Sequence, residues 1–244
     1  MKYPIFFMFV FSAAVAFAAS PFDGIFRDFA QDVTFCADFD APEALIAAGS
    51  EKPLTVSEDA QFGDGLSGRC LTKGKIVFDG AENISPTAGT IIFWLKLTRP
   101  TETPDPKEES FRPIYAAFQA ETRQEILIGK MDVLNQAPMY AYLQGHPEIP
   151  LVLVNSGKTT KTWKSGVWHL VIVSWKPGEL KISLDGQPFA ANTKLPALGG
   201  EAKVFSIQAS DHPLCAVAVD QVIVLKRPGT DEEAARIAEA VPTF

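Results

Sequence analysis

The sequence predicts an all-β fold, a sandwich of two antiparallel sheets followed by one short helix. Short runs rich in Val, Ile, Phe and Trp recur along the chain, and Gly, Pro, Asp and Asn bound them, as is typical of strands and turns. Only the last segment has the periodicity of a convincing helix. Many short strands almost without helices indicate a β-sandwich or jelly roll.

The N-terminus has the pattern of a secretory signal peptide. Lys2 precedes an apolar run that begins at Ile5 and ends in the small-residue pattern Ala16-Phe17-Ala18. This run is shorter than the ~20 residues that a membrane span needs, and we expect cleavage after Ala18 or the next residue. We therefore expect a signal peptide at 1–19, a lead-in at 20–32 and an exported jelly-roll domain at 33–244, located in the periplasm, at the cell surface or outside the cell.

Charge and length narrow the classes of protein further. The formal net charge is −7 and no basic run occurs, which argues against nucleic acid as a partner. No second apolar segment is long enough for a membrane span, so we expect no transmembrane segment after signal removal. The mature chain of about 225 residues fits one large β domain, since sandwiches reach about 200–250 residues.

The predicted strands follow one another with turn residues between them. In chain order they are Val33–Phe39, Arg69–Phe78, Thr90–Leu97, the runs PIYAAFQ, EILIGKM, MYAYLQ and LVLVNS between residues 113 and 156, Trp168–Trp175, Leu180–Leu184, Lys203–Ala209 and Ala216–Lys226. The longest irregular stretch, residues 99–110, is rich in proline and charge and is interpreted as a solvated loop.

The most patterned stretch is the hairpin that starts at Trp168. Alternate residues of a strand share a face, so Trp168 and Trp175 point to opposite faces and cannot form one ligand platform. Both faces are largely apolar, which indicates a central strand covered on both sides. Pro177-Gly178 predicts a type II turn after it, and Asp185-Gly186 predicts a second tight turn.

The C-terminal segment predicts the one helix. Thr230 and Glu233 form a T-x-x-E capping box. The acidic residues of the first turn suit the positive end of the helix dipole. One face carries the apolar residues Ala234, Ile237, Ala238 and Val241.

Five stretches in the right order resemble the concanavalin A-like, laminin G-type jelly roll. The hairpin WHLVIVSW…LKISLDGQ resembles its signature hairpin. ADFDAPEA, FGDGLSGRCLT, GTIIFWLKL and AVDQVIVLKRPGTDEEAARIAE resemble its opening strand, glycine-rich entry, tryptophan-bearing strand and closing strand with helix. The resemblance covers about residues 33–241. It implies a two-sheet antiparallel jelly-roll sandwich with a short C-terminal helix, adjacent first and last strands, and a core role for Trp94 and Trp168. The resemblance says little about function, because proteins with this fold have many different activities.

Catalytic patterns of the relatives are missing. The laminarinase-type motif E-x-D-x-x-E does not occur, and its nearest imitation is Glu121 with Glu125. On one strand these carboxylates would lie ~13 Å apart, too far for the about 5–9.5 Å that glycosidases use, and a turn between them would make them loop charges. No G-x-S-x-G elbow supports a serine hydrolase, and His169 is expected to be packed or hydrogen-bonded. We therefore predict no catalytic residues.

Two places are candidates for ligand binding. Tyr140, Tyr142 and Gln144 would share one face of a strand, the only polar-aromatic row that could contact a sugar. Trp163 lies in a polar stretch before the hairpin, where exposure would suit stacking on a sugar or partner. The prediction is an exported, non-catalytic binding module that contacts carbohydrate, an extracellular protein or another extracellular surface. A divergent glycoside hydrolase or lyase and a structural cell-surface protein stay as alternatives.

Cysteines and calcium complete the candidates. Of Cys36, Cys70 and Cys215, the first two lie in early strands and form the favoured disulfide, with three buried free thiols as the alternative. Laminin G-like domains often hold calcium, and the resemblance makes Asp38, Asp40, Asp64 and Asp220 its candidates. No EF-hand-like loop is present, so no cofactor is predicted. Asp220 is expected to satisfy backbone groups near the closing strand.

Overall fold

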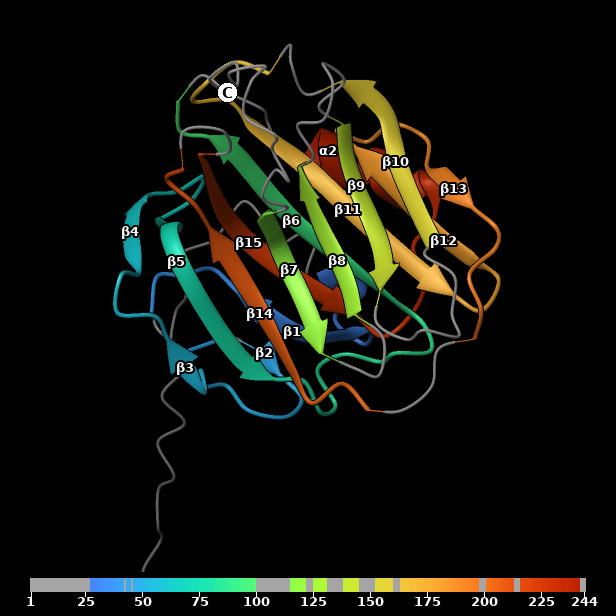
Figure 1. The fold of residues 1–244 in the computed structure, drawn as a ribbon, viewed down its shortest axis with the longest axis horizontal. Helices are drawn as coiled ribbons and strands as arrows, with labels where there is room; N and C mark the ends of the chain where they lie inside the picture. The colour runs from blue at the N-terminus through green and yellow to red at the C-terminus, as the bar shows by residue number, and fades with distance from the viewer. Residues whose placement is uncertain are drawn as a thin grey trace, which may run out of the picture.

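The computed structural model contains two antiparallel sheets that pack face to face (Figure 1), so the predicted fold class is confirmed. It describes residues 27–41, 43–44, 46–99, 115–121, 125–130, 138–144, 152–159, 163–197, 201–212 and 216–241. Within those ranges, no helix combines the length and the apolar character needed to cross a membrane.

The strands of each sheet follow a fixed spatial order. Sheet A consists of β2 (Ile46–Ala47), β1 (Val33–Ala37), β15 (Val217–Leu225), β6 (Gly89–Leu97), β11 (Trp168–Lys176), β12 (Glu179–Leu184) and β13 (Ala190–Asn192). Sheet B consists of β3 (Thr55–Val56), β5 (Arg69–Asp79), β14 (Val204–Ala209), β7 (Tyr115–Glu121), β8 (Glu125–Lys130), β9 (Pro138–Gln144) and β10 (Val152–Thr159). The first and last strands, β1 and β15, are paired, as the resemblance implied.

One strand, β5, belongs to both sheets. Its first half pairs with β15 and with β4 (Gln61–Asp64) in sheet A, and its second half pairs with β14 and β3 in sheet B. Gly74, between the halves, has a φ of +90°, and a Cβ there would lie 2.6 Å from Ala60 Cα. Only glycine fits this backbone, which bends the strand from one sheet to the other.

The main hydrophobic core lies between the sheets. Phe35 of sheet A packs edge to face against Phe78 and Phe205 of sheet B, with ring centroids 4.9 and 4.6 Å away. Trp175 of β11 points into the same core and is 1% exposed. Its Nε1–H donates to the Ser85 carbonyl oxygen at 3.1 Å, so the buried polar atom is satisfied.

A second core lies on the outer face of sheet A, beneath α2 (Asp231–Ala240), which covers that face (Figure 1). Trp94 and Trp168 pack there with the buried helix residues Ala234 and Ile237. The two tryptophans of the hairpin therefore lie in different cores on opposite faces of β11, as the strand period predicted.

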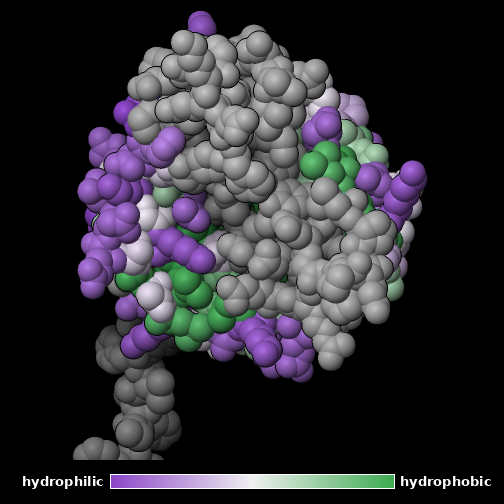
Figure 2. Space-filling view, viewed as in Figure 1, coloured by the Kyte–Doolittle hydropathy of each residue, from purple (hydrophilic) through white to green (hydrophobic). Residues whose placement is uncertain are grey.

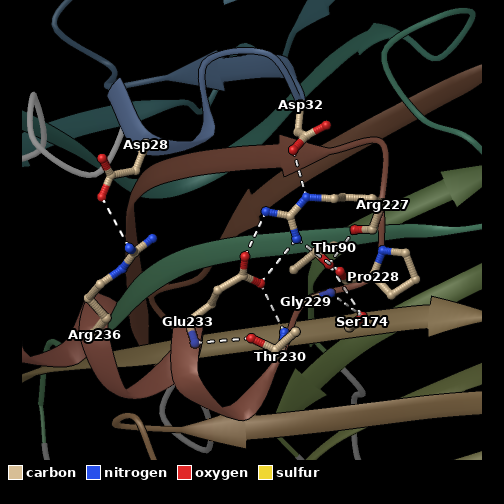
Figure 3. A network of polar contacts seen from close by, with 10 residues as sticks. All are labelled: Asp28, Asp32, Thr90, Ser174, Arg227, Pro228, Gly229, Thr230, Glu233 and Arg236. Carbon is tan, nitrogen blue, oxygen red and sulfur yellow. Dashed lines mark hydrogen bonds and ion pairs between the residues drawn. The ribbon is translucent and has the colours of Figure 1, made fainter.

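The start of α2 is held by the polar network of Figure 3. The predicted capping box is present, with the Glu233 N–H donating to Thr230 Oγ1 and the Thr230 N–H donating to the Glu233 carboxylate. Arg227 donates to both Glu233 carboxylate oxygens and to Asp32, which connects the helix to the segment before β1. Although burial raises the pKa of Glu233, the hydrogen bonds from Arg227 and Thr230 and the positive charge of Arg227 together outweigh it and lower the pKa overall.

The favoured disulfide is not present. Cys36 and Cys70 are buried free thiols in the outer core of sheet A. They lie on β1 and β5, which pair with different halves of β15, and the Cys70 thiol donates to the Asp64 carbonyl oxygen at 3.2 Å. Cys215 lies outside the described residues.

The short strands β2, β3, β4 and β13 were not predicted, because runs of two to four residues carry too little periodicity.

Candidate functional site

The outer face of sheet B is turned away from α2, and Figure 1 shows its strands in front. Strand register aligns one residue from each strand in a row across this face. Along each strand, the residues next to the row position face the core between the sheets. From β10 to β5 the row consists of Leu153, Tyr142, Leu127, Gln119, Ser206 and Val77. Tyr142, from the run with the polar-aromatic pattern, thus occupies a position of the outer face on β9, the strand next to the β10 edge of the sheet.

The neighbouring candidates share this placement. Tyr140, Tyr142 and Gln144 alternate along β9 with Met139 and Ala141, both of which are buried in the core between the sheets. The structure describes the backbone of the three candidates but not their side chains. Their role in binding therefore stays a prediction.

A pocket with a volume of about 180 Å³ lies at the β5 edge of the same face. We call it the β5 pocket, and its lining residues are Ser57, Asp59, Lys73, Gly74, Lys75, Gln208, Ala209, Ser210 and Asp211. It forms where β5 bends at Gly74, so the change of sheet is what creates the hollow. Figure 2 shows hydrophilic residues gathered on the side of this face that carries β4 and β5.

Lys75 and Gln208 connect the β5 pocket to the row that contains Tyr142. They are register partners on β5 and β14, two residues along from Val77 and Ser206, and so occupy the same face. Neither side chain makes a hydrogen bond or ion pair with another described residue. An ammonium group and an amide are therefore free to bind a polar ligand, because both donate hydrogen bonds and the amide also accepts them.

The other polar residues of the β5 pocket are partly committed. Lys73 Nζ lies 3.0 Å from Asp211 Oδ2. This hydrogen bond lowers the pKa of Asp211 and raises the pKa of Lys73. Ser57 Oγ accepts from the Lys75 backbone N–H at 2.8 Å, and Ser210 Oγ accepts from the His212 N–H at 3.1 Å. Asp211 is consequently an ionised hydrogen-bond acceptor, not an acid that could protonate a leaving group.

Trp163 is half-buried and packs against the core between the sheets. Its ring stacks on His169, with centroids 3.8 Å apart and planes 5° from parallel. Asp185 Oδ2 lies 2.9 Å from His169 Nδ1, which confirms that His169 is packed and hydrogen-bonded. One face of the indole is therefore occupied by His169, and contact between Trp163 and a ligand stays a prediction for the rest of the ring.

The candidate carboxylates Glu121 and Glu125 lie on two strands, at the end of β7 and the start of β8, and not ~13 Å apart along one strand. Because Ala120 pairs with Ile126 in antiparallel register, the two glutamate positions are neighbours across the connection between these strands. The structure describes their backbone but not their side chains, so the absence of a catalytic pair stays a prediction. Asp220 is fully buried and accepts hydrogen bonds from the backbone N–H groups of Leu66 and Gln221, as expected. Burial raises the pKa of Asp220 to about 8, although these backbone bonds lower it.

Two further calcium candidates, Asp38 and Asp40, accept backbone hydrogen bonds within the chain. Asp38 Oδ1 accepts from the Asp40 N–H at 3.0 Å, and Asp40 Oδ1 accepts from the Arg69 N–H at 2.7 Å. The part of the chain that the structure describes holds no group of three or more His, Cys, Asp or Glu residues arranged to bind a metal ion.

Sequence comparisons identify no relative: no family model matches, and no curated protein matches. Solved structures do match. Domain 4 of AbnA, a GH43 extracellular arabinanase from Geobacillus stearothermophilus in complex with arabinotriose, has a TM-score of 0.63 and 15% identity, over 85% of this chain and 98% of that domain. The fold is a concanavalin A-like jelly roll.

Toxin binding domains share this jelly roll. The binding domain of Paraclostridial Mosquitocidal Protein 1 has a TM-score of 0.65 and 13% identity, over 85% of this chain and 52% of that chain. The binding domain of botulinum neurotoxin DC in complex with SialylT has a TM-score of 0.63 and 13% identity, over 86% of this chain and 52% of that chain. The chain thus spans about half the length of these toxin domains.

Proposed function

We propose that this protein is an exported, non-catalytic binding module that contacts carbohydrate through the outer face of sheet B. The observation that carries the proposal is the β5 pocket, an open polar hollow in which Lys75 and Gln208 have no partner among the described residues. Sugars present many hydroxyl groups, and a mixture of hydrogen-bond donors and acceptors in a hollow of this kind suits them.

The solved structures support a binding role. The arabinanase domain was solved with arabinotriose and is covered almost completely by this chain, so the shared part is a whole domain. The toxin structures are binding domains as well, one of them in complex with SialylT.

The position of the predicted aromatic residues extends the proposed surface. The row that contains Tyr142 ends at the pair Ser206 and Val77, and Gln208 and Lys75 form the next pair on the same face. Tyr140 and Gln144 flank Tyr142 on β9. Aromatic rings combine an apolar face with a polar group, which suits the two sides of a sugar ring. A glycan of several units would lie across β9, β8, β7 and β14 and end in the β5 pocket. Trp163 is a further proposed contact, from the segment before β11.

Binding fits the charges of the β5 pocket better than catalysis does. A glycosidase needs one carboxylic acid that keeps its proton near neutral pH beside a second, ionised carboxylate. The hydrogen bond from Lys73 lowers the pKa of Asp211 instead. The pocket therefore offers an ionised hydrogen-bond acceptor, and we expect the bound glycan to be released without being cleaved.

A glycan array followed by calorimetry with the best glycan and with arabinotriose tests the proposal. Gln208→Ala removes a free amide from the β5 pocket, and Tyr142→Ala removes the aromatic ring from the row. Gln187→Ala, at an exposed turn residue, is the matched control. We expect binding that each pocket-face variant weakens and that the control leaves unchanged. Absence of glycan binding, or release of cleaved sugar during the assay, would overturn the proposal.

A further inference from the structure

The charged residues that line the β5 pocket balance, whereas the whole protein is acidic. The chain has a formal net charge of −7. The lining contains Lys73, Lys75, Asp59 and Asp211. The two lysines and two carboxylates of the lining balance, and Arg99, which donates to the Asp211 carbonyl oxygen, lies beside the lining.

The ion pairing within the lining leaves Lys75 without a carboxylate partner among the described residues. Lys73 is neutralised by Asp211, with which it forms the 3.0 Å ion pair. Lys75 makes no ion pair with another described residue, and Asp59 is the remaining carboxylate of the lining. Lys75 is thus an ammonium group of the hollow that no described carboxylate holds in an ion pair.

The register places a second donor beside the free ammonium group. Lys75 and Gln208 are directly opposite on antiparallel strands, so their Cβ atoms lie ~4.5–5.5 Å apart. An ammonium and an amide N–H at this spacing can each donate to one oxygen of a carboxylate. Hydrogen bonds to an ionised acceptor are stronger than bonds to a neutral hydroxyl.

From this arrangement we infer that the β5 pocket selects sugars that carry a carboxylate, so that the ligand of the module is an acidic, uronic acid-containing glycan. The inference rests on the proposed function, since it names the class of glycan bound at the same site. The carboxylate lies between Lys75 and Gln208, and hydroxyl groups of the ring contact the Asp211 and Ser57 side of the pocket. Because the pocket is open to solvent, the preference for the acidic sugar weakens as ionic strength rises.

The test compares trimers of galacturonate, glucuronate, mannuronate and guluronate with their methyl esters, which keep the sugar but remove the charge. Calorimetry at low salt should show at least one acid bound about tenfold more tightly than its ester, the change that one charge-assisted hydrogen bond supplies. Lys75→Gln should reduce that ratio to about one. Lys226→Gln, which makes the same charge change at an exposed residue just after β15, should leave the ratio intact.

The outcomes separate this inference from the proposed function. If neutral glycans bind and no acid is preferred over its ester, or if Lys75→Gln keeps the preference, the charge selectivity is wrong and the binding module stands. If neither acids, esters nor any neutral glycan of the array bind, both proposals are wrong. If the acids bind and high salt leaves their advantage over the esters unchanged, the preference does not arise from Lys75 and the inference is also overturned.

Discussion

Gly89 and Trp175 allow a quantitative test of how the core between the sheets is packed. They are register partners on β6 and β11. A Cβ on Gly89 would lie 2.4 Å from Cζ2 of Trp175 and 2.7 Å from Cη2. The backbone of Gly89 lies outside the left-handed region, so the conflict is purely steric. The indole cannot move away easily, because it is 1% exposed and its Nε1–H donates to the Ser85 carbonyl oxygen.

Gly89→Ala should therefore lower the free energy of unfolding by about 1–3 kcal/mol, the usual cost of overpacking a core. For a chain of this size, 2 kcal/mol corresponds to a fall in Tm of about 4–8 °C. Trp175→Phe should cost a similar amount by itself, because it removes the indole hydrogen bond, worth about 1 kcal/mol, and part of a buried ring. Urea unfolding followed by far-UV circular dichroism measures both changes.

The double variant decides whether the reasoning holds. A phenylalanine ring is shorter and vacates the space that the new methyl group needs, so the two costs should not add. We expect the double variant to be about 1–2 kcal/mol more stable than the sum of the single changes predicts. Additive costs, or a Gly89→Ala variant as stable as the parent protein, would show that the indole does not fill this space.

Three further predictions concern the helix cap, a buried acid and the thiols. Thr230→Ala should lower the free energy of unfolding in urea by about 1 kcal/mol through loss of the N-cap bond, and an unchanged midpoint would contradict the capping role. Because burial raises the pKa of Asp220 from 3.8 to about 8, the folded state keeps a proton that the unfolded chain releases. The stabilisation that this proton provides is complete below pH 3.8 and is lost as pH rises through 8. The urea midpoint should thus fall over this window, and the decline should be smaller in Asp220→Asn; equal slopes would refute the assignment. In a Cys215→Ser variant, Cys36 and Cys70 should resist Ellman's reagent at pH 8 in the native state, since burial raises the pKa of both thiols. Both should react in urea, and no reaction there would indicate the disulfide.

The outer faces of the two sheets differ in the residues that they carry. The outer face of sheet A carries Trp94, Trp168 and Ile172, which α2 covers. Removing that apolar surface from water stabilises the domain. The corresponding face of sheet B instead carries polar positions such as Ser206, Gln208 and Lys75, and it lies away from α2 (Figure 1).

The long strands and the helix could be predicted because their signals are local. The alternating run Trp168–Trp175 became β11, and Thr230 with Glu233 became the cap of α2. Both depend on backbone geometry that repeats every two or 3.6 residues, so neighbouring residues reveal it. The preferred Cys36–Cys70 bridge was wrong for the opposite reason, since two cysteines in early strands say nothing about which halves of β15 those strands meet.

The sequence by itself determined the fold class, the opposite directions of Trp168 and Trp175, the packed state of His169 and the backbone-binding role of Asp220. The β5 pocket was decided only in the tertiary structure. Its residues come from the segment before β4, from the bend at Gly74 and from the end of β14. Lys75 meets Gln208 across 133 residues of sequence (208 − 75) because β5 changes sheets beside β14. No local pattern encodes such pairing, since strand order depends on how all the apolar faces are buried together.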